Sequence, residues 1–567
     1  MQKDHFWILA IPVLIIVLAA VFSAPSVLAQ SEDGYLWPVK GRIEVTGVFC
    51  DPRSGHPHGG IDISHFGKVG SVPIVSVEKG LLMRIRSSEY GYGNAVYILM
   101  PGGKVAVYAH LNRFSKRMQN VATEIRRKTG LLRLDYYYEP DEMIVAVAKG
   151  EIIGYGGKSG TSTAHLHFEI RQDDLVNLNP LTNGFAIIDT VAPNIRGIML
   201  SPVDLKSRIN GRGRAKAYSK ASVAKAGPLR VKGRVGLSAN VTDQNRKGGR
   251  RYHPYAMKIF VDHQPYFETR YEKWGYIDQN VWLTQYDEAA AGKKYMRVYN
   301  PYPVEIPFFS SADKGTFHDL SPGAHHVELV AADAAGLVDR LEFSIFVEED
   351  SDSAKRPWPL GQGAHELFND RVVDVNEGAF ALVGNKYSFF EPVLVDIQSG
   401  SASSDACYYV SDPGVRLRRK IGVRFRYDAK DANPKRLGVF FMDGADAKFL
   451  GAAHDPAHRF ISADGDAFGR FCLLRDDTSP SIENVRVAKG GGPSISFHAR
   501  DDLSGFSRDS VRVFVDGRLA LVDFRPRLGA AKAKVYWKLD PGAHVALIET
   551  TDRLGNKARY SQPFIMP

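Results

Sequence analysis

Two histidines separated by one residue, His165 and His167, lie within the segment Thr161–Glu169. Apolar residues alternate with them, and a period of two is typical of a β-strand. One face of that strand then carries both imidazoles together with Glu169. Neighbouring imidazoles can bind a metal ion together, or one can bind it while the other moves protons. The segment therefore indicates metal or acid–base chemistry, although the same pair also occurs on ordinary surface strands.

Two further segments supply groups for the same chemistry. His58–Asp62 places a histidine and a carboxylate four residues apart around two glycines, which let one backbone approach another closely. Val107–Leu111 carries His110 and follows a hairpin-like run over Gly93–Gly103. Catalytic zinc takes three protein ligands from His and Asp or Glu and leaves a fourth position for water. The candidate ligands come from segments that are far apart in the sequence, as expected for a site that forms only when the chain folds.

The three segments together carry a family resemblance. His58–Asp62, Tyr108–Leu111 and Ser159–Glu169 follow the motif order of the lysostaphin-type (LytM-like) zinc endopeptidases, which cut peptide cross-links in bacterial peptidoglycan. The resemblance covers Trp37–Asn183, roughly a quarter of the chain. It implies a small antiparallel, barrel-like β-sheet of the duplicated hybrid motif type with a groove across it.

The resemblance also implies a division of roles within the site. Its zinc ligands are His58, Asp62 and His167, while His110 and His165 are catalytic residues that do not bind the metal. His165 would be the general base for the attacking water. His110 would stabilise the tetrahedral intermediate or protonate the leaving amine, and the two roles can be exchanged. Tyr108 is either a further donor at the site or a core aromatic residue.

The chain departs from the family in an insertion near residues 112–144. It contains the basic run Ile125–Lys128 and the tyrosine cluster Tyr136–Tyr138, and Ser115–Lys128 is expected as a short basic helix. Because the insertion follows the Tyr-x-His-Leu motif directly, it must emerge beside the site. It would then grip the substrate or act as a lid; the alternative is a loop packed away from the groove.

The rest of the chain reads as further β domains, so the fold class is mainly β. After the metallopeptidase domain at 36–186, residues 190–348 and 477–567 are two copies of one module, expected as immunoglobulin-like β-sandwiches. Leu320–His325 parallels Leu539–His544, and the same Asp-x-x-Gly follows each. The recurring histidines are interpreted as structural. Residues 360–475 are expected to be a β domain of unknown type.

The first 29 residues are interpreted as a signal peptide or an uncleaved membrane anchor. Lys3 precedes an uncharged run over Phe6–Ala24, and Val27–Ala29 resembles the small-residue pattern that precedes a signal-peptide cleavage site. Either alternative exports the rest of the chain to the periplasm, cell envelope or exterior. Export permits disulfides, and Cys407 with Cys472 is a candidate pair.

Composition narrows the classes of partner. The net charge of +10 and pI near 9.2 either draw an exported protein to anionic cell-wall polymers or lipids, or merely keep it soluble. Nucleic acid is not expected, and a membrane is expected only if the N-terminal segment stays uncleaved. Cys50, near His58, is expected to be a buried thiol rather than a fourth ligand.

These observations predict an exported zinc metalloendopeptidase that hydrolyses peptide cross-links of peptidoglycan, with Zn²⁺ as its cofactor. Two alternatives stay open. One is a non-catalytic envelope protein that controls another wall hydrolase, with the immunoglobulin-like modules binding an envelope protein partner. The other is a zinc peptidase that acts on protein, because the metal chemistry does not specify the peptide.

Overall fold

A computed structural model describes residues 34–567 except 41, 54–55, 67, 205, 288–294, 350–364, 369, 387, 391–392, 401–405, 412–416 and 489–492. The N-terminal segment interpreted as a signal peptide or anchor lies outside the described residues, as do the first residues of the expected domain at 360–475. Within the described ranges, no helix has the length and apolar character needed to cross a membrane.

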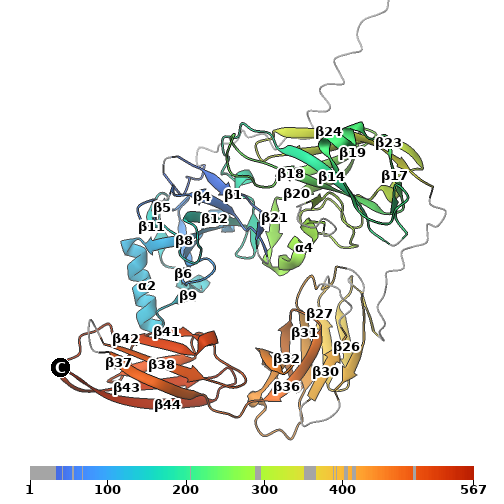
Figure 1. The fold of residues 1–567 in the computed structure, drawn as a ribbon. Helices are drawn as coiled ribbons and strands as arrows, with labels where there is room; N and C mark the ends of the chain where they lie inside the picture. The colour runs from blue at the N-terminus through green and yellow to red at the C-terminus, as the bar shows by residue number, and fades with distance from the viewer. Residues whose placement is uncertain are drawn as a thin grey trace, which may run out of the picture.

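The prediction of a mainly β chain is confirmed, since nearly all elements are strands in antiparallel sheets (Figure 1). Four parts follow one another: the N-terminal domain, the first sandwich (194–347), the middle sandwich (365–475) and the C-terminal sandwich (481–566). Each part has a buried apolar core cluster of its own.

The N-terminal domain is built on a twelve-stranded sheet. Its main path runs in the order β1 (Val45–Gly47), β4 (Ile61–Ser64), β12 (His165–Arg171), β8 (Val105–Phe114), β7 (Asn94–Leu99), β6 (Gly80–Ser87) and β10 (Ala146–Val147). The strands joined beside this path are β5 (Pro73–Val75), β9 (Leu134–Tyr137), β11 (Ile152–Gly156), β13 (Val176–Leu178) and β21 (Lys273–Gly275). The last of these comes from the first sandwich, so the sheet extends beyond residues 36–186.

One face of this sheet packs on the apolar core of the domain. Leu166 and Phe168 of β12 and Tyr108 of β8 are fully buried in that core. The Phe168 ring lies 5.4 Å from that of Tyr108 and 4.8 Å from that of Phe185. Because strand residues alternate between faces, this packing leaves His165, His167 and Glu169 on the other face.

The insertion forms a helix and a strand. Helix α2 (Lys116–Thr129) begins after Ser115, whose hydroxyl accepts a hydrogen bond from the Met118 amide, and ends at Gly130 with a left-handed backbone. The apolar side of α2 packs on the N-terminal core through Met118, Ala122 and Ile125. Strand β9 then pairs with β6. The expected basic helix is therefore present, and its charged side chains are exposed except for that of Arg126, which is half-buried.

The first sandwich consists of two sheets whose buried faces share one core. The sheets run β16 (Lys216–Ser219), β14 (Asn194–Pro202), β18 (Val235–Thr242), β22 (Met296–Arg297), and β15 (Arg208–Ile209), β17 (Leu229–Lys232), β24 (Val338–Val347), β23 (Gly323–Ala332), β19 (Ala256–Val261), β20 (Gln264–Arg270). Two short helices, α3 (Lys220–Lys225) and α4 (Trp282–Gln285), lie between strands.

The C-terminal sandwich repeats the plan in shorter form. Its sheets run β37 (Ser481–Ala488), β38 (Ser494–Arg500), β42 (Ala530–Lys534), β41 (Leu521–Arg525), and β40 (Arg518–Leu519), β39 (Val511–Val515), β43 (Gly542–Thr551), β44 (Lys557–Met566). The recurring turn histidines make the same bonds in both copies: His325 pairs with Asp262 at 2.7 Å, and His544 with Asp516 at 2.5 Å. Their interpretation as structural residues agrees with these contacts.

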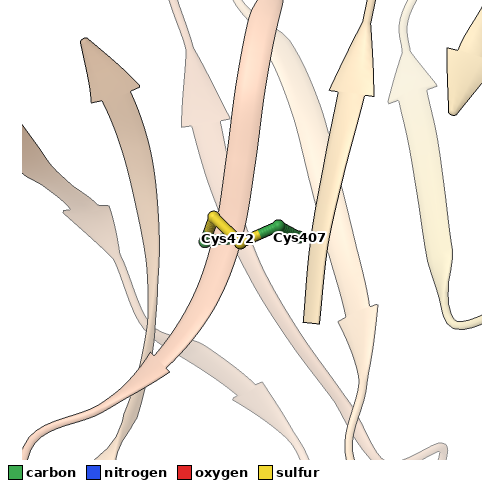
Figure 2. Close-up of a disulfide and its surroundings, with 2 residues drawn as sticks. All are labelled: Cys407 and Cys472. Carbon is green, nitrogen blue, oxygen red and sulfur yellow. A yellow bond between two sulfur atoms is a disulfide. The ribbon is translucent and has the colours of Figure 1, made fainter. Parts of the chain in front are cut away.

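The middle sandwich contains a disulfide between its strands. Its sheets run β26 (Val373–Glu377), β27 (Phe380–Gly384), β31 (Ile421–Arg426), β35 (Phe460–Gly465), β34 (Ala453–Asp455), and β29 (Ile397–Ser399), β30 (Ala406–Val410), β36 (Gly469–Arg475), β32 (Leu437–Asp443), β33 (Asp446–Gly451). Cys407 and Cys472 lie opposite each other on β30 and β36 and are bonded, with 4.1 Å between their Cα atoms (Figure 2).

The four parts form a closed ring (Figure 1). The C-terminal sandwich returns to the insertion, where the amide of Leu132 donates to the carbonyl of Val522 and Arg133 pairs with Asp523. The Val522 amide donates in turn to Gly130, at the end of α2. The insertion is thus held on its outer side by the most distant part of the chain.

Candidate metal centre

Three adjacent strands carry most of the candidate site. β12 pairs with β4 on one side, where His167 lies opposite Asp62, and with β8 on the other, where His167 lies opposite Ala109. Directly opposed residues share a face of the sheet. The pairing therefore places the Asp62 carboxylate beside the His167 imidazole on the face away from the core.

His58 reaches the same point from the loop before β4, and two glycines allow it. A Cβ atom on Gly60 would lie 2.0 Å from the Phe168 carbonyl oxygen, and one on Gly59 would lie 2.6 Å from a Glu169 oxygen. The loop therefore crosses β12 in direct backbone contact, which only glycine permits. Backbone bonds between His58 and Cys50 and Asp51 hold the other side of the loop.

The three predicted ligands converge on one point. The Nε2 atom of His58 lies 3.0 Å from Oδ1 of Asp62 and 2.9 Å from Nδ1 of His167, and these last two atoms are 3.1 Å apart. All three side chains are buried. Four ligands around zinc at 2.0–2.1 Å lie about 3.3 Å apart, so the triangle fits one zinc ion after a small expansion.

Hydrogen bonds on the far side of each ring determine which nitrogen faces this point. Nδ1 of His58 donates to the Val48 carbonyl at 2.7 Å, and Nε2 of His167 donates to Glu169 Oε1 at 2.7 Å. His58 Nε2 therefore presents a lone pair to the triangle. Without a metal, Asp62 and Glu169 overcome the effect of burial and raise the pKa of His167 to about 9. A proton on Nδ1 of His167 can form a hydrogen bond across only one of the three short contacts in the triangle. A cation that replaces this proton can bind all three atoms at once.

The resemblance named no partner for His167, yet the structure supplies one in Glu169. This carboxylate is fully buried and also accepts hydrogen bonds from Tyr92 at 2.7 Å and from Arg171 Nε at 2.7 Å. Burial disfavours its charge, but Arg171 and His167 hold its pKa well below its usual range. A carboxylate behind a ligating histidine orients the ring and raises its basicity. The strand alternation placed Glu169 on this face but did not indicate this role.

The first sandwich contributes to this support. Tyr276, which follows β21, brings its hydroxyl within 2.6 Å of the Tyr92 hydroxyl, and it accepts a hydrogen bond from Arg171 at 3.0 Å. β21 itself pairs with β13, which continues the sheet from β12. Tyr276, about one hundred positions beyond the motifs, therefore belongs to the hydrogen-bond network behind His167. No local sequence pattern around the motifs indicates this contact.

The candidate ligand Asp62 has a partner that sequence reasoning also missed. Nη2 of Arg53 donates to its second oxygen, Oδ2, at 2.6 Å. Burial disfavours the charged carboxylate, but His58 and His167 hold the pKa of Asp62 well below its usual range. Asp62 is therefore ionised at neutral pH, and Arg53 directs its free oxygen, Oδ1, towards the two histidines.

His110 reaches the site through a local break in its strand. Regular alternation would put His110 on the core face with Tyr108, because Ala109 lies opposite His167. The backbone of His110 is left-handed, with φ at 60°, and its amide bonds to Tyr92 instead of continuing the ladder. Its ring consequently lies 4.8 Å from that of His165 and 5.8 Å from that of His167. Such an irregularity re-aims a side chain next to a site.

His110 and His165 are both arranged as neutral bases. Nδ1 of His110 donates to the Ser159 carbonyl at 2.8 Å, and Nδ1 of His165 to the Thr163 carbonyl at 3.1 Å. Each Nε2 therefore keeps its lone pair. Burial and the neighbouring histidines lower the pKa of His110 to about 3, and burial lowers that of His165 as well. Nε2 of His165 lies 3.4 Å from Asp62 Oδ1, beside the ligand triangle.

Two other sequence candidates lie outside the site. Tyr108 is a core residue: its ring packs on Phe168, and its hydroxyl accepts a hydrogen bond from the Val77 amide at 2.9 Å. Cys50 is a buried free thiol that packs in the core cluster of the first sandwich, and burial raises its pKa. A shallow pocket beside His110 is lined by Ser88, Glu89 and residues Lys158–Ser162.

Comparison with known proteins gives structural likeness only. No protein-family model matches the chain, and no curated protein matches it. Among solved structures, a catalytic-domain mutant of the prophage-encoded M23 protein EnpA from Enterococcus faecalis is similar, with 22% identity, a TM-score of 0.17, and coverage of 25% of this chain and 87% of that one. A zinc-containing peptidase from Vibrio cholerae has 22% identity and a TM-score of 0.18, over 26% of this chain.

The chain spans only 39% of the length of the Vibrio protein. Because both likenesses concern about a quarter of the chain at low similarity, the functional inference below rests on the geometry of the site instead.

Proposed function

We propose that the protein is an exported zinc metalloendopeptidase that hydrolyses peptide cross-links of peptidoglycan. The observation that carries the proposal is the buried triangle of His58 Nε2, Asp62 Oδ1 and His167 Nδ1, with two neutral histidines beside it. Two nitrogens and one carboxylate oxygen are a donor set that suits zinc, and three protein ligands leave the fourth position to water, as in catalytic rather than structural sites.

Each residue around the triangle has a separate task in this proposal. Zinc, when bound, supplies Lewis acidity towards a water molecule and towards the scissile carbonyl. His165, which lies against Asp62, takes the proton of the attacking water on its Nε2. His110, which faces the other side of His165, can donate a hydrogen bond to the developing oxyanion or a proton to the leaving amine only after its Nε2 has taken up a proton. The proton that His165 removes from the water is the source of that proton. Glu169 and Arg53 hold the ligands in position throughout.

The substrate class rests on the motif resemblance and on charge. The three motifs are those of enzymes that act on wall peptides, and the net charge of +10 favours an anionic polymer as the surface to which the protein is drawn. The pocket beside His110 carries Lys158 and the hydroxyls of Ser159, Thr161 and Ser162, which can bond peptide carbonyls and carboxylates. Export places the enzyme where such a polymer lies.

Digestion of purified sacculi tests this proposal. The zinc-loaded full chain is incubated with sacculi, and the released fragments are identified by mass spectrometry. His165→Ala, with its zinc content measured, is the matched inactive control. We expect new amino termini within cross-link peptides for the wild type and none for the variant. Intact cross-links with a zinc-loaded, folded wild-type protein would contradict the proposal.

The same assay separates the alternatives. An unfolded protein substrate incubated in parallel reports on a zinc peptidase that acts on protein. Cleavage of that substrate with intact sacculi would move the proposal to protein as the substrate. No cleavage of either, with zinc bound and sacculi retained in a pull-down, would favour a non-catalytic wall-binding protein.

A further inference from the structure

Two clusters of aspartates lie away from the metal centre, at matching places in the two repeated sandwiches. The first consists of Asp189, Asp243 and Asp333, and the second of Asp476, Asp501 and Asp552. In each cluster, one carboxylate oxygen of every member lies within 4.8 Å of those of the others. Three ionised carboxylates at such distances repel one another unless a positive charge lies between them or one of them takes up a proton.

The two clusters are equivalent position by position. Asp189 and Asp476 each precede the first strand of a sandwich and accept a hydrogen bond from the amide two residues later. Asp243 directly follows β18, as Asp501 follows β38. Asp333 directly follows β23, as Asp552 follows β43. The clusters therefore belong to the shared fold of the two copies.

Two of the three members of the first cluster are buried, and the cluster lacks a compensating charge. Asp243 is 4% exposed and Asp333 is 3% exposed. None of its three carboxylates forms an ion pair with the lysines, arginines or histidines that the structure describes. Oδ1 of Asp333 accepts hydrogen bonds from the amides of Ala335 and Leu337, but its Oδ2 is buried with no partner among the described residues. A buried carboxylate oxygen without a partner is costly, which points to a ligand that the protein itself does not supply.

In the second cluster, a side chain that the first cluster lacks satisfies the equivalent oxygen. Asn556 occupies the position of Leu337, and its side-chain amide donates to Oδ2 of Asp552 at 2.7 Å. The same amide also donates to the Asp476 carbonyl at 2.8 Å. The C-terminal sandwich thus fills its cluster with an amide, whereas the first sandwich has leucine there and leaves the oxygen free.

We propose that Asp189, Asp243 and Asp333 bind a divalent cation, and that the cation is calcium. The donors are all oxygen atoms, which hard cations prefer, whereas zinc sites usually include nitrogen or sulfur. Calcium binds oxygens at 2.3–2.6 Å, so that two oxygens on opposite sides of it lie at most about 5 Å apart. Calcium also has flexible coordination, so it accepts carboxylates supplied by three separate segments more readily than magnesium, which demands a near-ideal octahedron.

The position of this site gives the cation a structural task. Asp243 forms a backbone bridge with Tyr252, whose ring packs in the core of the N-terminal domain. The next residue, His253, donates through its amide to Asp51, and the carbonyl of Asp51 accepts from the amide of His58. The cation would therefore clamp the linker before β14 and two loops of the first sandwich where they meet the domain that carries the metal centre.

Calcium binding can be measured without the catalytic metal. The full chain with His167→Ala, which removes a ligand of the zinc site, is stripped of metal and titrated with CaCl2 by calorimetry. We expect one calcium per chain and a rise in Tm of several degrees. Asp333→Asn should weaken binding by at least about tenfold, because it removes one of three charges. Asp552→Asn is the matched control and should leave calcium binding unchanged.

A second variant tests the comparison between the copies. Leu337→Asn places in the first sandwich the amide that fills the second cluster. It should fold and lose most of the Tm increase caused by CaCl2. The proposal is overturned if calcium neither binds nor raises the Tm, if Asp552→Asn abolishes binding while Asp333→Asn does not, or if MgCl2 binds more tightly than CaCl2.

Discussion

Replacing Glu169 by glutamine tests whether this carboxylate strengthens metal binding by His167, because the substitution leaves all three candidate ligands in place. Glu169 accepts from His167 Nε2 with one oxygen and from Arg171 Nε with the other, each at 2.7 Å. A glutamine has one oxygen and one NH₂ group. Its NH₂ group must therefore face either the N–H of His167 or the N–H of Arg171, and two donors cannot bond to each other. If the glutamine oxygen faces His167, the hydrogen bond to His167 remains but the acceptor is no longer charged. If that oxygen faces Arg171, His167 Nε2 has no acceptor.

The size of the effect follows from this geometry. Loss of a carboxylate behind a ligating histidine typically lowers metal affinity 10- to 100-fold, or about 1.4 to 2.7 kcal/mol. Arg171 also loses a charged partner, but Asp174 remains bonded to it at 2.6 Å. We therefore expect a lower Tm in a protein that still folds, together with zinc binding weakened about 10- to 100-fold.

Competition against a chromophoric chelator at constant pH measures this affinity. Glu142→Gln, a change at an exposed residue of the same domain, serves as the control for the loss of one charge. Asp62→Asn sets the scale for the loss of a ligand. If folded Glu169→Gln bound zinc within twofold of the wild type, the carboxylate would not support the metal, and the proposed role of Glu169 would be wrong.

Three further predictions concern the site and the fold. His110→Ala and His165→Ala should each keep zinc and lose about 10²- to 10⁴-fold in hydrolysis rate, measured on a cross-link peptide; loss of zinc in either variant would make that histidine a ligand. Gly60→Ala should abolish zinc binding and lower the Tm, because its Cβ would lie 2.0 Å from the Phe168 carbonyl oxygen. The control Gly227→Ala, with no atom within 4 Å of the added Cβ, should behave as wild type, and equal Tm values for the two would refute the close contact. The double substitution of Cys407 and Cys472 by serine should destabilise the middle sandwich by about 4 kcal/mol for a loop of 65 residues, measured by denaturant unfolding, while zinc binding stays unchanged.

The sequence predicted the strand that carries His165, His167 and Glu169 and the helix after Ser115, because these depend on local periodicity and turn residues. It also identified the three groups that converge in the triangle, although only the order of motifs indicated their assembly. Period-two alternation failed at His110, where the left-handed backbone reverses the face that the strand pattern assigns. The same alternation could not decide whether Tyr108 lies at the site or in the core, and the structure shows that it lies in the core.

What the sequence did not indicate depends on contacts between distant segments. Arg53 and Glu169 act through hydrogen bonds whose partners become neighbours only when β4 and β12 pair. Tyr276 approaches Arg171 because a strand of the first sandwich joins the N-terminal sheet. The insertion could be predicted as a helix, but not its contact with Val522, since neither surface has a pattern that identifies the other.

The closed ring has a consequence for the order of folding. Arg133 and Asp523, whose contact closes it, are 390 positions apart in the chain. The entropy of closing a loop grows only with the logarithm of its length, about 0.6 kcal/mol per doubling, and domains that are already folded shorten the effective loop. The contact nevertheless forms late, because the C-terminal sandwich that carries Asp523 is synthesised after every other part of the chain. During synthesis, the N-terminal domain therefore folds with the outer end of α2 uncovered, and that surface acquires its final neighbour only after the last strands have paired.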